Sequence, residues 1–290
     1  MTEVLRYAAF VDPRVPGGGN PAGVVPDASS LSDADMQAIA ADVGYSETAF
    51  LTGRRGDARS IRYFSPIAEV PFCGHATIAT AVVLAEREGT GRLRFATPVG
   101  EVVIDTSEDD DEFPGDAGGI RASFTSVEPD VSELDPAVLA ELLRVLGLTD
   151  ADLAPEHPPR LSFAGNRHPV LVLSDQETFD GFTFDPDDAR ELMDREGWAG
   201  TITVAHRLGP VEWEARNPFP VGEITEDPAT GSAAAAFGAY LRSLGAAGDG
   251  SVVTIRQGRH VGRPSLLRVG IPAAGGITVS GTASPIDSIR

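Results

Sequence analysis

The sequence predicts two similar domains of mixed α and β structure, and three observations support this prediction. Strand-like apolar runs occur along the whole chain, and only a few helical patterns interrupt them. The chain contains 32 glycines and 22 prolines, which favours many turns and short elements. Patterns of the first half recur in the second half. The 290 residues, 42% of them hydrophobic, are enough for two domains of ordinary size.

Helices are expected where apolar periodicity coincides with capping residues. Ser32 is typical of a residue that caps a helix start, and Asp135 and Asp185 each precede a proline at the first helical position. Glycines follow several of the expected helix ends. The expected helices cover Asp33–Val43, His75–Glu88, Pro136–Leu146, Pro186–Glu196 and Ser232–Leu244.

Strands are expected where apolar and β-branched residues form short runs between turns. In the first half these runs cover Val4–Phe10, Ala22–Val25, Glu47–Thr52, Ser60–Phe64, Arg92–Ala96 and Glu101–Asp105. In the second half they cover Pro169–Leu173, Thr201–Ala205, Val252–Arg256, Leu266–Gly270 and Gly276–Gly281.

One repeated pattern links an arginine, a proline and a glutamate in each half. In RYFSPIAEVPFCGHATIATA, which starts at Arg62, the proline follows after four residues and the glutamate after seven. RNPFPVGEITEDPATGSAAAAF, which starts at Arg216, has the same spacing. The constant offset places Cys73 opposite Asp227, and an alanine-rich helix is expected after both.

A second repeated pattern supports the first. Gly19-Asn20 and Gly165-Asn166 each precede a strand-like run. Because the two patterns occur in the same order, we infer an internal duplication. The boundary is expected within residues 115–130, where glycine and proline cluster. The predicted domains are therefore residues 1–122 and 123–290.

Composition excludes several classes of partner. The formal net charge of −20 argues against nucleic acid and against an anionic membrane surface. No window approaches the run of about 18 apolar residues that spans a membrane, and the first residues lack a signal-peptide layout, so a cytoplasmic protein is expected. The acidic run Glu108–Glu112 is expected to be a solvated loop. With one cysteine, Cys73, and histidines without metal-ligand spacing, no metal site is expected.

The starts of two expected helices are candidate anion sites. Gly74-His75 and Gly231-Ser232 each place small residues where a helix begins. Free N–H groups and the helix dipole attract negative charge at such positions. If the halves are related by a pseudo-two-fold axis, the two helix starts face each other across a cleft and bind a carboxylate between them. Such an arrangement stabilises negative charge that develops during proton abstraction.

Proton abstraction also needs a base, and four residues are candidates: Glu47, Cys73, His75 and Asp227. Each of them, taken alone, also fits an ordinary structural role. Glu47 fits a loop carboxylate, His75 a helix cap, Cys73 a small buried hydrophobe and Asp227 a turn residue. Their matching places in the two halves are what single them out.

At these residues the sequence resembles the PhzF-like family of phenazine-biosynthesis isomerases. The matching segments are GNPAGVV at Gly19–Val25, YSETAFL at Tyr45–Leu51, EVPFCGHAT at Glu69–Thr77 and EDPATGSA at Glu226–Ala233. The resemblance implies an α+β fold of the diaminopimelate epimerase type, with two pseudo-symmetric domains. Each domain would be a curved mixed β-sheet wrapped around a central helix, and the central helices would begin near His75 and Ser232. A homodimer and the absence of a cofactor are also implied.

The resemblance also assigns roles to residues. It implies that Glu47 is the acid/base that removes and returns a proton, assisted by His75, Asp227 and Ser232. It further implies a substrate pocket lined by Asn20, Ser46, Cys73, Gly74 and Gly231. Epimerase relatives use two opposed cysteines, but here Asp227 stands opposite Cys73. A symmetric two-thiol reaction is therefore not expected.

Three functional hypotheses follow. The first is an isomerase in which Glu47 moves a proton on a small carboxylate-bearing substrate. The second is an amino-acid epimerase or racemase that uses Cys73 and Asp227 from opposite faces. The third is a non-catalytic protein that binds a small molecule on the same scaffold.

Overall fold

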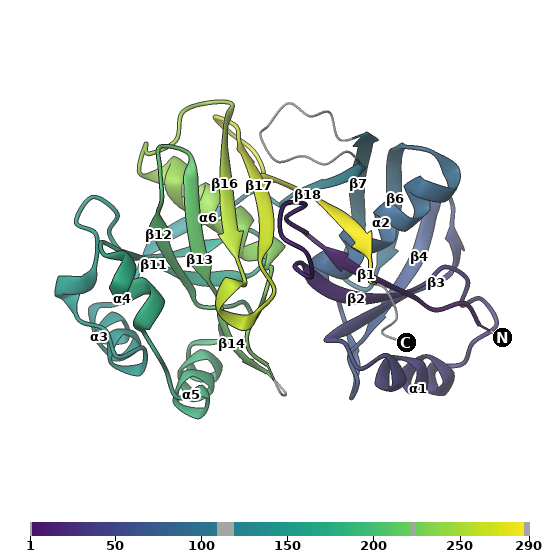
Figure 1. Ribbon diagram of the computed structural model, residues 1–290, viewed down its shortest axis with the longest axis horizontal. Helices are drawn as coiled ribbons and strands as arrows, with labels where there is room; N and C mark the ends of the chain where they lie inside the picture. Colours follow the sequence, from purple (N-terminus) through teal and green to yellow (C-terminus); the bar gives the residue numbers. More distant parts are fainter. Residues whose placement is uncertain (1, 109–118, 222–223, 287–290) are drawn as a thin grey trace. The chain divides into compact units, whose positions relative to one another are not determined.

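The computed structural model describes residues 2–108, 119–221 and 224–286, and the chain divides into two compact units (Figure 1). The first unit contains residues 1–125 and 280–290, and the second contains residues 126–279. The predicted division at residue 122 differs from these units mainly at the C-terminus. The last strand, β18 (Thr278–Pro285), pairs with the first strand, so its residues from Ser280 onward belong to the first unit. A strand that returns in this way leaves no mark in the sequence.

The first unit is a mixed sheet that closes on itself. Its strand order is β1-β2-β3-β4-β6-β7-β8, and β18 lies next to β8 and also pairs with β1. The short β5 pairs with β4. The strands are β1 (Leu5–Ala9), β2 (Asn20–Val25), β3 (Glu47–Arg55), β4 (Ala58–Phe64), β5 (Glu69–Val70), β6 (Gly91–Thr97), β7 (Gly100–Glu108) and β8 (Ile120–Thr125).

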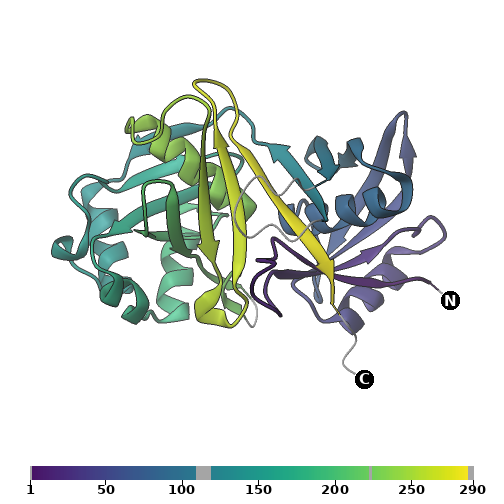
Figure 2. The same ribbon diagram turned by 45° about the horizontal axis from the view of Figure 1, so that its top comes forward.

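The helix α2 (Gly74–Glu88) fills the inside of this barrel-like sheet (Figures 1 and 2). It packs against β1, β2, β3, β7 and β8, and all its residues from His75 to Ala85 are buried. Burial on every side explains why the helix is rich in alanine, since small side chains let the strands approach it closely. The other helix, α1 (Asp33–Val43), covers the sheet with Met36 and Ala40 packed against Phe50 and Phe64.

The second unit is also a mixed sheet, with the strand order β9-β10-β11-β12-β13-β16-β17. A separate hairpin of β14 and β15 leads into the helix α6 (Gly231–Ser243), which packs against β9, β10, β11 and β17. The strands are β9 (Asp130–Glu133), β10 (Arg160–Phe163), β11 (Arg167–Leu173), β12 (Thr203–Arg207), β13 (Glu212–Arg216), β14 (Pro218–Val221), β15 (Ile224–Glu226), β16 (Ser251–Gln257) and β17 (Ser265–Ile271).

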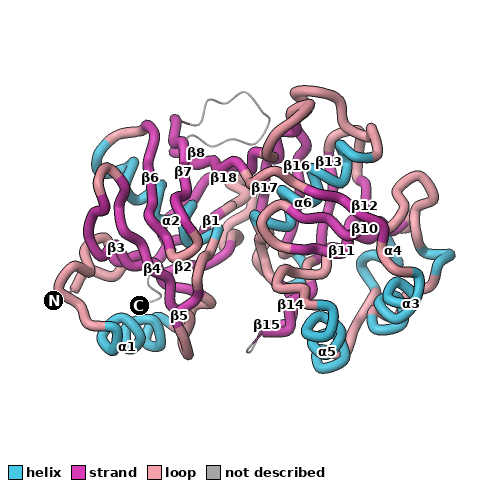
Figure 3. The backbone as a smooth tube through the Cα atoms, turned by 180° about the vertical axis from the view of Figure 1, so that it is seen from behind, coloured by secondary structure: helices cyan, strands magenta, loops and turns pink. Residues whose placement is uncertain are grey.

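Three shorter helices cover the second sheet on the side away from α6 (Figure 3). They are α3 (Pro136–Val145), α4 (Gln176–Gly181) and α5 (Pro186–Glu196). Their apolar faces form one cluster with β11 and β12, centred on large buried side chains such as Leu142, Phe179 and Leu192. Two short 3₁₀ helices, η1 (Asp150–Asp152) and η2 (Arg259–Val261), complete the described elements.

The two units share one order of strand pairing. From β1 to β7, neighbouring strands pair antiparallel, parallel, antiparallel, parallel and antiparallel. From β10 to β17 the order is the same. In each unit a buried alanine-rich helix follows a short hairpin. The repeats found in the sequence therefore have a counterpart in the topology.

The expected helices are all present with ends within one residue of the prediction. Ser32, Asp135 and Asp185 cap them as predicted, through bonds from their side chains to backbone N–H groups. The prediction missed several strands, of which β13 is the most instructive. Its sequence EWEAR reads as polar, yet Glu214 and Arg216 are buried because each pairs with an opposite charge. Most of the acidic run, residues 109–112, lies outside the described residues.

Candidate active site

Four predicted site residues of the first unit lie together at the start of α2. The Cys73 Sγ atom is 3.5 Å from Glu47 Oε2 and 3.3 Å from His75 Nδ1. His75 Nε2 is 3.5 Å from the same Glu47 oxygen. Asn20 Nδ2 lies 3.2 Å from His75 Nδ1. Asn20, Cys73 and His75 are buried, whereas 21% of the Glu47 side chain is exposed. The carboxylate is thus the member of the cluster that an entering molecule meets.

Parallel pairing of β2 and β3 brings Asn20 and Glu47 to the same end of the sheet. Both residues begin their strands, and Ala22 pairs with Glu47. The turn before β2 requires glycine at position 19, where φ is +82° and an added Cβ would lie 2.8 Å from the Ala9 carbonyl oxygen. The GN pair therefore combines a glycine needed for the turn with an asparagine that reaches the site.

The partners of His75 indicate which ring nitrogen acts as the acceptor. The Asn20 amide nitrogen only donates, so it requires His75 Nδ1 to be an acceptor. The ring proton of a neutral His75 is then on Nε2, which lies 3.5 Å from Glu47 Oε2. Asn20 thereby selects the tautomer that places a donor beside Glu47.

The two central helices differ from the other α-helices at their first residues. The helices α1, α3, α4 and α5 each begin with a side chain that accepts from backbone N–H groups. No such bond is made by Cys73 at the start of α2 or by Thr230 at the start of α6. The Cys73 side chain contacts Glu47 and His75 instead, and the Thr230 side chain donates to Asp227. The first amides of both helices are thus left without a side-chain cap, as an anion site requires.

In the second unit, Asp227 is held by a compact network. Its Oδ2 accepts from Thr230 Oγ1 at 2.6 Å, and its backbone carbonyl accepts from Gln257 Nε2 at 2.6 Å. The Asp227 N–H donates to the Asn217 carbonyl at 3.0 Å. Gln257 also accepts from the Thr230 N–H at 3.2 Å. These bonds fix the EDP segment against the start of α6.

A buried ion pair secures the strand that leads to Asp227. Arg216 donates to Glu226 through two nitrogens and also to the carbonyls of Phe179 and Phe182. The corresponding residue of the first unit, Arg62, pairs with Glu69 on β5. The repeated arginine therefore anchors the hairpin before each central helix. Glu223, the residue that the repeat places opposite Glu69, lies outside the described residues.

His168 makes the main side-chain contact to Ser232. Its Nδ1 is 2.9 Å from the Thr201 carbonyl oxygen, which only accepts, so Nδ1 carries the proton. Nε2 is therefore an acceptor for the Ser232 hydroxyl, 3.1 Å away. Complete burial lowers the pKa of His168 to about 4, which keeps the ring neutral near pH 7. Gly200 leaves space for the ring, because a Cβ there would lie 2.5 Å from His168 Cε1.

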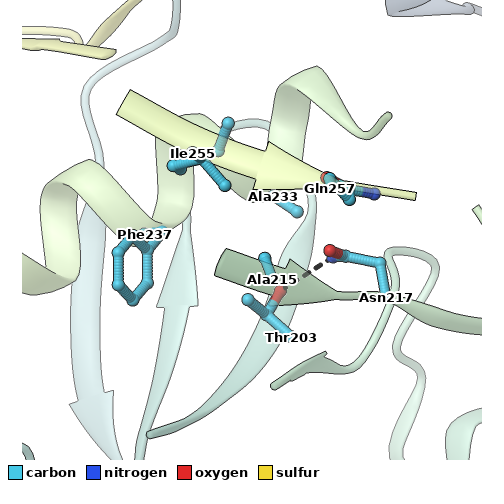
Figure 4. A pocket seen from close by; sticks show the side chains of 8 residues that line it. Thr203, Ala215, Asn217, Ala233, Phe237, Ile255 and Gln257 are labelled. Carbon is cyan, nitrogen blue, oxygen red and sulfur yellow. Dashed lines mark hydrogen bonds between the residues drawn. The ribbon is translucent and has the colours of Figure 1, made fainter. Parts of the chain in front are cut away.

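A small cavity adjoins this network in the second unit. Figure 4 shows it between Phe237 on one side and Asn217 and Gln257 on the other. The Asn217 amide nitrogen donates to Thr201 and Thr203, whereas its buried Oδ1 has no partner in the structure. The cavity has room for about one water molecule. It is thus too small for a substrate, and the candidate site is defined by the helix starts instead.

The predicted residues thus fall into two groups. Asn20, Glu47, Cys73 and His75 form the first, and Gly74 is half-buried at the first position of α2. Ser46 is half-buried in the bend before β3. The second group contains Asp227, Gly231 and Ser232.

Four further residues of the second group were not predicted from the sequence: His168, Asn217, Thr230 and Gln257. A signal for His168 was present, since it follows the second GN pair by two residues. Thr230 lies within the matched EDPATGSA segment. No local pattern marks Asn217 or Gln257, whose roles depend on distant partners.

Known proteins resemble this chain along nearly its whole length. Residues 7–287 match the profile of the PhzC-PhzF family, described as phenazine biosynthesis-like proteins. The chain belongs to this family. It is 32% identical over 291 residues to the uncharacterized isomerase YddE of Escherichia coli K12, which covers 97% of this chain and 95% of the relative. It is 33% identical over 254 residues to the trans-2,3-dihydro-3-hydroxyanthranilate isomerase of Pseudomonas fluorescens, covering 87% of this chain and 85% of that protein.

A solved structure supports the fold. The PhzF-family phenazine biosynthesis protein of Bacillus anthracis superimposes with a TM-score of 0.84 at 24% identity, covering 99% of this chain and 97% of that chain. The fold is thus α+β with few helices and a barrel-like sheet. The relatives over nearly the whole chain are named isomerases, and this chain is an isomerase. The hypothesis of a non-catalytic protein that binds a small molecule is therefore not retained. Among the described helices, none has the length and apolar character needed to cross a membrane.

Proposed function

We propose that this isomerase moves a proton on a small carboxylate-bearing substrate without a cofactor, and that Glu47 is its acid/base. The observation that carries the proposal is the setting of the Glu47 carboxylate. It is partly exposed, it lies beside the uncapped start of α2, and a histidine nitrogen and a thiol sulfur each lie 3.5 Å from the same oxygen. Contacts of that length are at the outer limit of hydrogen bonding, so the carboxylate remains available to a substrate.

The proposed reaction has two proton transfers. The ionised Glu47 takes a proton from a carbon next to a carboxyl or carbonyl group, and negative charge develops on the neighbouring oxygen. Amides at the start of α2 stabilise this charge, as donors in oxyanion holes do. Glu47 then delivers the proton to another carbon of the same molecule. His75, whose Nε2 lies 3.5 Å from Glu47 Oε2, is proposed to keep the carboxylate oriented through both steps.

The second unit is proposed to act on the same substrate. Ser232 is the second residue of α6, and its hydroxyl proton is directed to His168. Its backbone amide and that of Gly231 are then proposed to bind the substrate carboxylate. Asp227, fixed by Thr230, is proposed to assist by binding a polar group of the substrate. The interdomain cleft of the sequence-based hypothesis stays a prediction, as do the pseudo-symmetry, the homodimer and the cytoplasmic location.

An epimerase that uses Cys73 is the second candidate, and one contact favours it. Cys73 Sγ lies 3.3 Å from His75 Nδ1, a nitrogen that is able to accept the thiol proton. Asn20 shares that nitrogen, however, which weakens it as a base for the thiol. The isomerase mechanism requires the Glu47 side chain for turnover, whereas the epimerase mechanism requires that of Cys73.

Kinetics of matched variants test the proposal. The wild type, Glu47→Gln, Glu47→Asp and Cys73→Ala would be assayed on a panel of cyclic and amino-acid-derived carboxylates. The panel would include the substrate named for the Pseudomonas fluorescens relative. We expect Glu47→Gln to lose at least about 10²-fold in kcat, Glu47→Asp to keep partial activity, and Cys73→Ala to turn over. Normal turnover by Glu47→Gln, or complete loss in Cys73→Ala alone, would contradict the proposal.

A further inference from the structure

We propose that Glu47, Cys73 and His75 also form a binding site for a thiophilic divalent cation of the Zn²⁺ class, and that the bound cation inhibits the enzyme. Binding is inferred from the geometry alone, whereas inhibition rests on the proposed function of Glu47. Each of these three side chains offers one ligand atom, and the three atoms lie within 4.8 Å of one another. No other group of three histidine, cysteine or carboxylate side chains among the described residues meets this criterion.

The spacing of the three ligand atoms is close to that of a tetrahedral zinc site. Cys73 Sγ lies 3.5 Å from Glu47 Oε2 and 3.8 Å from His75 Nε2, and the nitrogen and oxygen are 3.5 Å apart. Zinc bonds of about 2.3 Å to sulfur and about 2.0–2.2 Å to nitrogen and oxygen place tetrahedral ligand atoms about 3.3–3.6 Å apart. A cation would therefore need only small side-chain adjustments.

The chemistry of the donors indicates which cation fits. A thiolate and an imidazole favour Zn²⁺ and similar soft or borderline ions over Mg²⁺ and Ca²⁺, which prefer oxygen. Three protein ligands leave a fourth position open, as in zinc sites that bind water or a substrate. Cys73 and His75 are each 7% exposed, so the partly exposed Glu47 carboxylate marks the side from which a cation enters.

Binding requires a defined change in protonation. The Cys73 thiol must lose its proton to ligate. His75 must present the Nε2 lone pair, so its ring proton has to be on Nδ1 instead. Rotation of the Asn20 amide would then place its oxygen as acceptor for Nδ1–H. Metal-bound histidines usually donate their second ring N–H to an oxygen acceptor in this way. The tautomer change conserves protons, so about one proton is released for each cation bound.

Inhibition follows from the shared carboxylate. Coordination would occupy Glu47 Oε2 and hold the carboxylate as a metal ligand, so that it no longer accepts a proton from carbon. The catalytic form pairs a protonated Nε2 with Glu47, and the cation-bound form replaces that proton with the metal. The two forms are therefore mutually exclusive.

Cobalt(II) titration of the full chain tests the site directly. A Co²⁺ ion in this site should give a near-ultraviolet thiolate charge-transfer band and the visible bands of tetrahedral coordination, and Zn²⁺ should displace it. Cys73→Ser should abolish the charge-transfer band, and Glu47→Gln and His75→Gln should weaken binding by at least about tenfold. The matched control His260→Gln removes a histidine outside the cluster and should bind as the wild type does. Calorimetry in buffers of different ionisation enthalpy should report about one proton released.

The outcomes separate the site from the function. Absence of a thiolate band, or equal affinity in the wild type and Cys73→Ser, would overturn the proposed site whatever the kinetics show. A thiolate band together with loss of turnover at saturating Zn²⁺ supports both parts. Full turnover with the site occupied would overturn the inhibition and the acid/base role of Glu47, while the site itself would stand.

Discussion

Burial of a neutral His168 makes the stability of the protein depend on pH in a predictable direction. Its ordinary pKa of 6.5 falls to about 4 in the folded protein, because burial disfavours the charged ring. As the pH falls below 6.5, His168 binds a proton in the unfolded chain but remains neutral in the folded protein. The stability contributed by the neutral ring is therefore complete above that pH and is lost as the pH falls toward 4.

The pKa difference sets the magnitude of this loss. As the pH falls from neutrality to the folded-state pKa of about 4, His168 accounts for a decrease of about 3 kcal/mol in the free energy of unfolding. About 2 kcal/mol of this decrease falls between about pH 7 and pH 5. Protonation would also remove the acceptor for the Ser232 hydroxyl, so activity should decline over the acid part of the same range.

Urea unfolding of the wild type and of His168→Asn, measured from pH 4 to pH 8, checks this prediction. Carboxylates titrate in both proteins, so the difference between the two curves isolates the histidine. The wild type should lose about 2 kcal/mol more than the variant between about pH 7 and pH 5. Parallel curves would refute the reasoning. An NMR titration of the wild type that gives His168 an ordinary pKa would refute it as well, even if the variant does not fold.

Three further substitutions test other parts of the structure. Gly200→Ala should cost about 1–3 kcal/mol in urea unfolding and reduce kcat, because the new methyl group would displace the His168 ring. Arg216→Met should cost about 3–5 kcal/mol, because it leaves the Glu226 carboxylate buried without its partner, and an unchanged melting temperature would contradict this. Ser32→Ala should cost about 1 kcal/mol through loss of a helix cap, with kcat unchanged.

Many helices and strands of the fold could be predicted from local signals in the sequence. The helix ends were predicted because capping depends on residues within one turn, as Ser32 and its partner Asp35 show. Strands with apolar alternation were predicted for the same reason. By contrast, β13 was missed because the burial of Arg216 depends on Glu226 and on carbonyls more than 30 residues away. The return of β18 to the first unit is likewise a long-range pairing without a local signal.

The candidate site shows the same division. Glu47, Cys73 and His75 lie in matched motifs, and the structure brings them within hydrogen-bonding or ion-pair distance. Their spacing in the sequence gave no sign of a shared cation site, because ligand atoms from a strand and a helix start meet only in the folded chain. Gln257 supports Asp227 from a strand 30 residues later and has no motif around it.

Isotope exchange tests the role of Glu47 most directly. The wild type and Glu47→Gln would be incubated in D₂O with a substrate that the wild type converts, and deuterium at each carbon would be followed by NMR. We predict deuterium at the carbon that receives the proton with the wild type, and none above background with a folded Glu47→Gln variant. Equal labelling by the two proteins would show that another group moves the proton, and the central claim would be wrong.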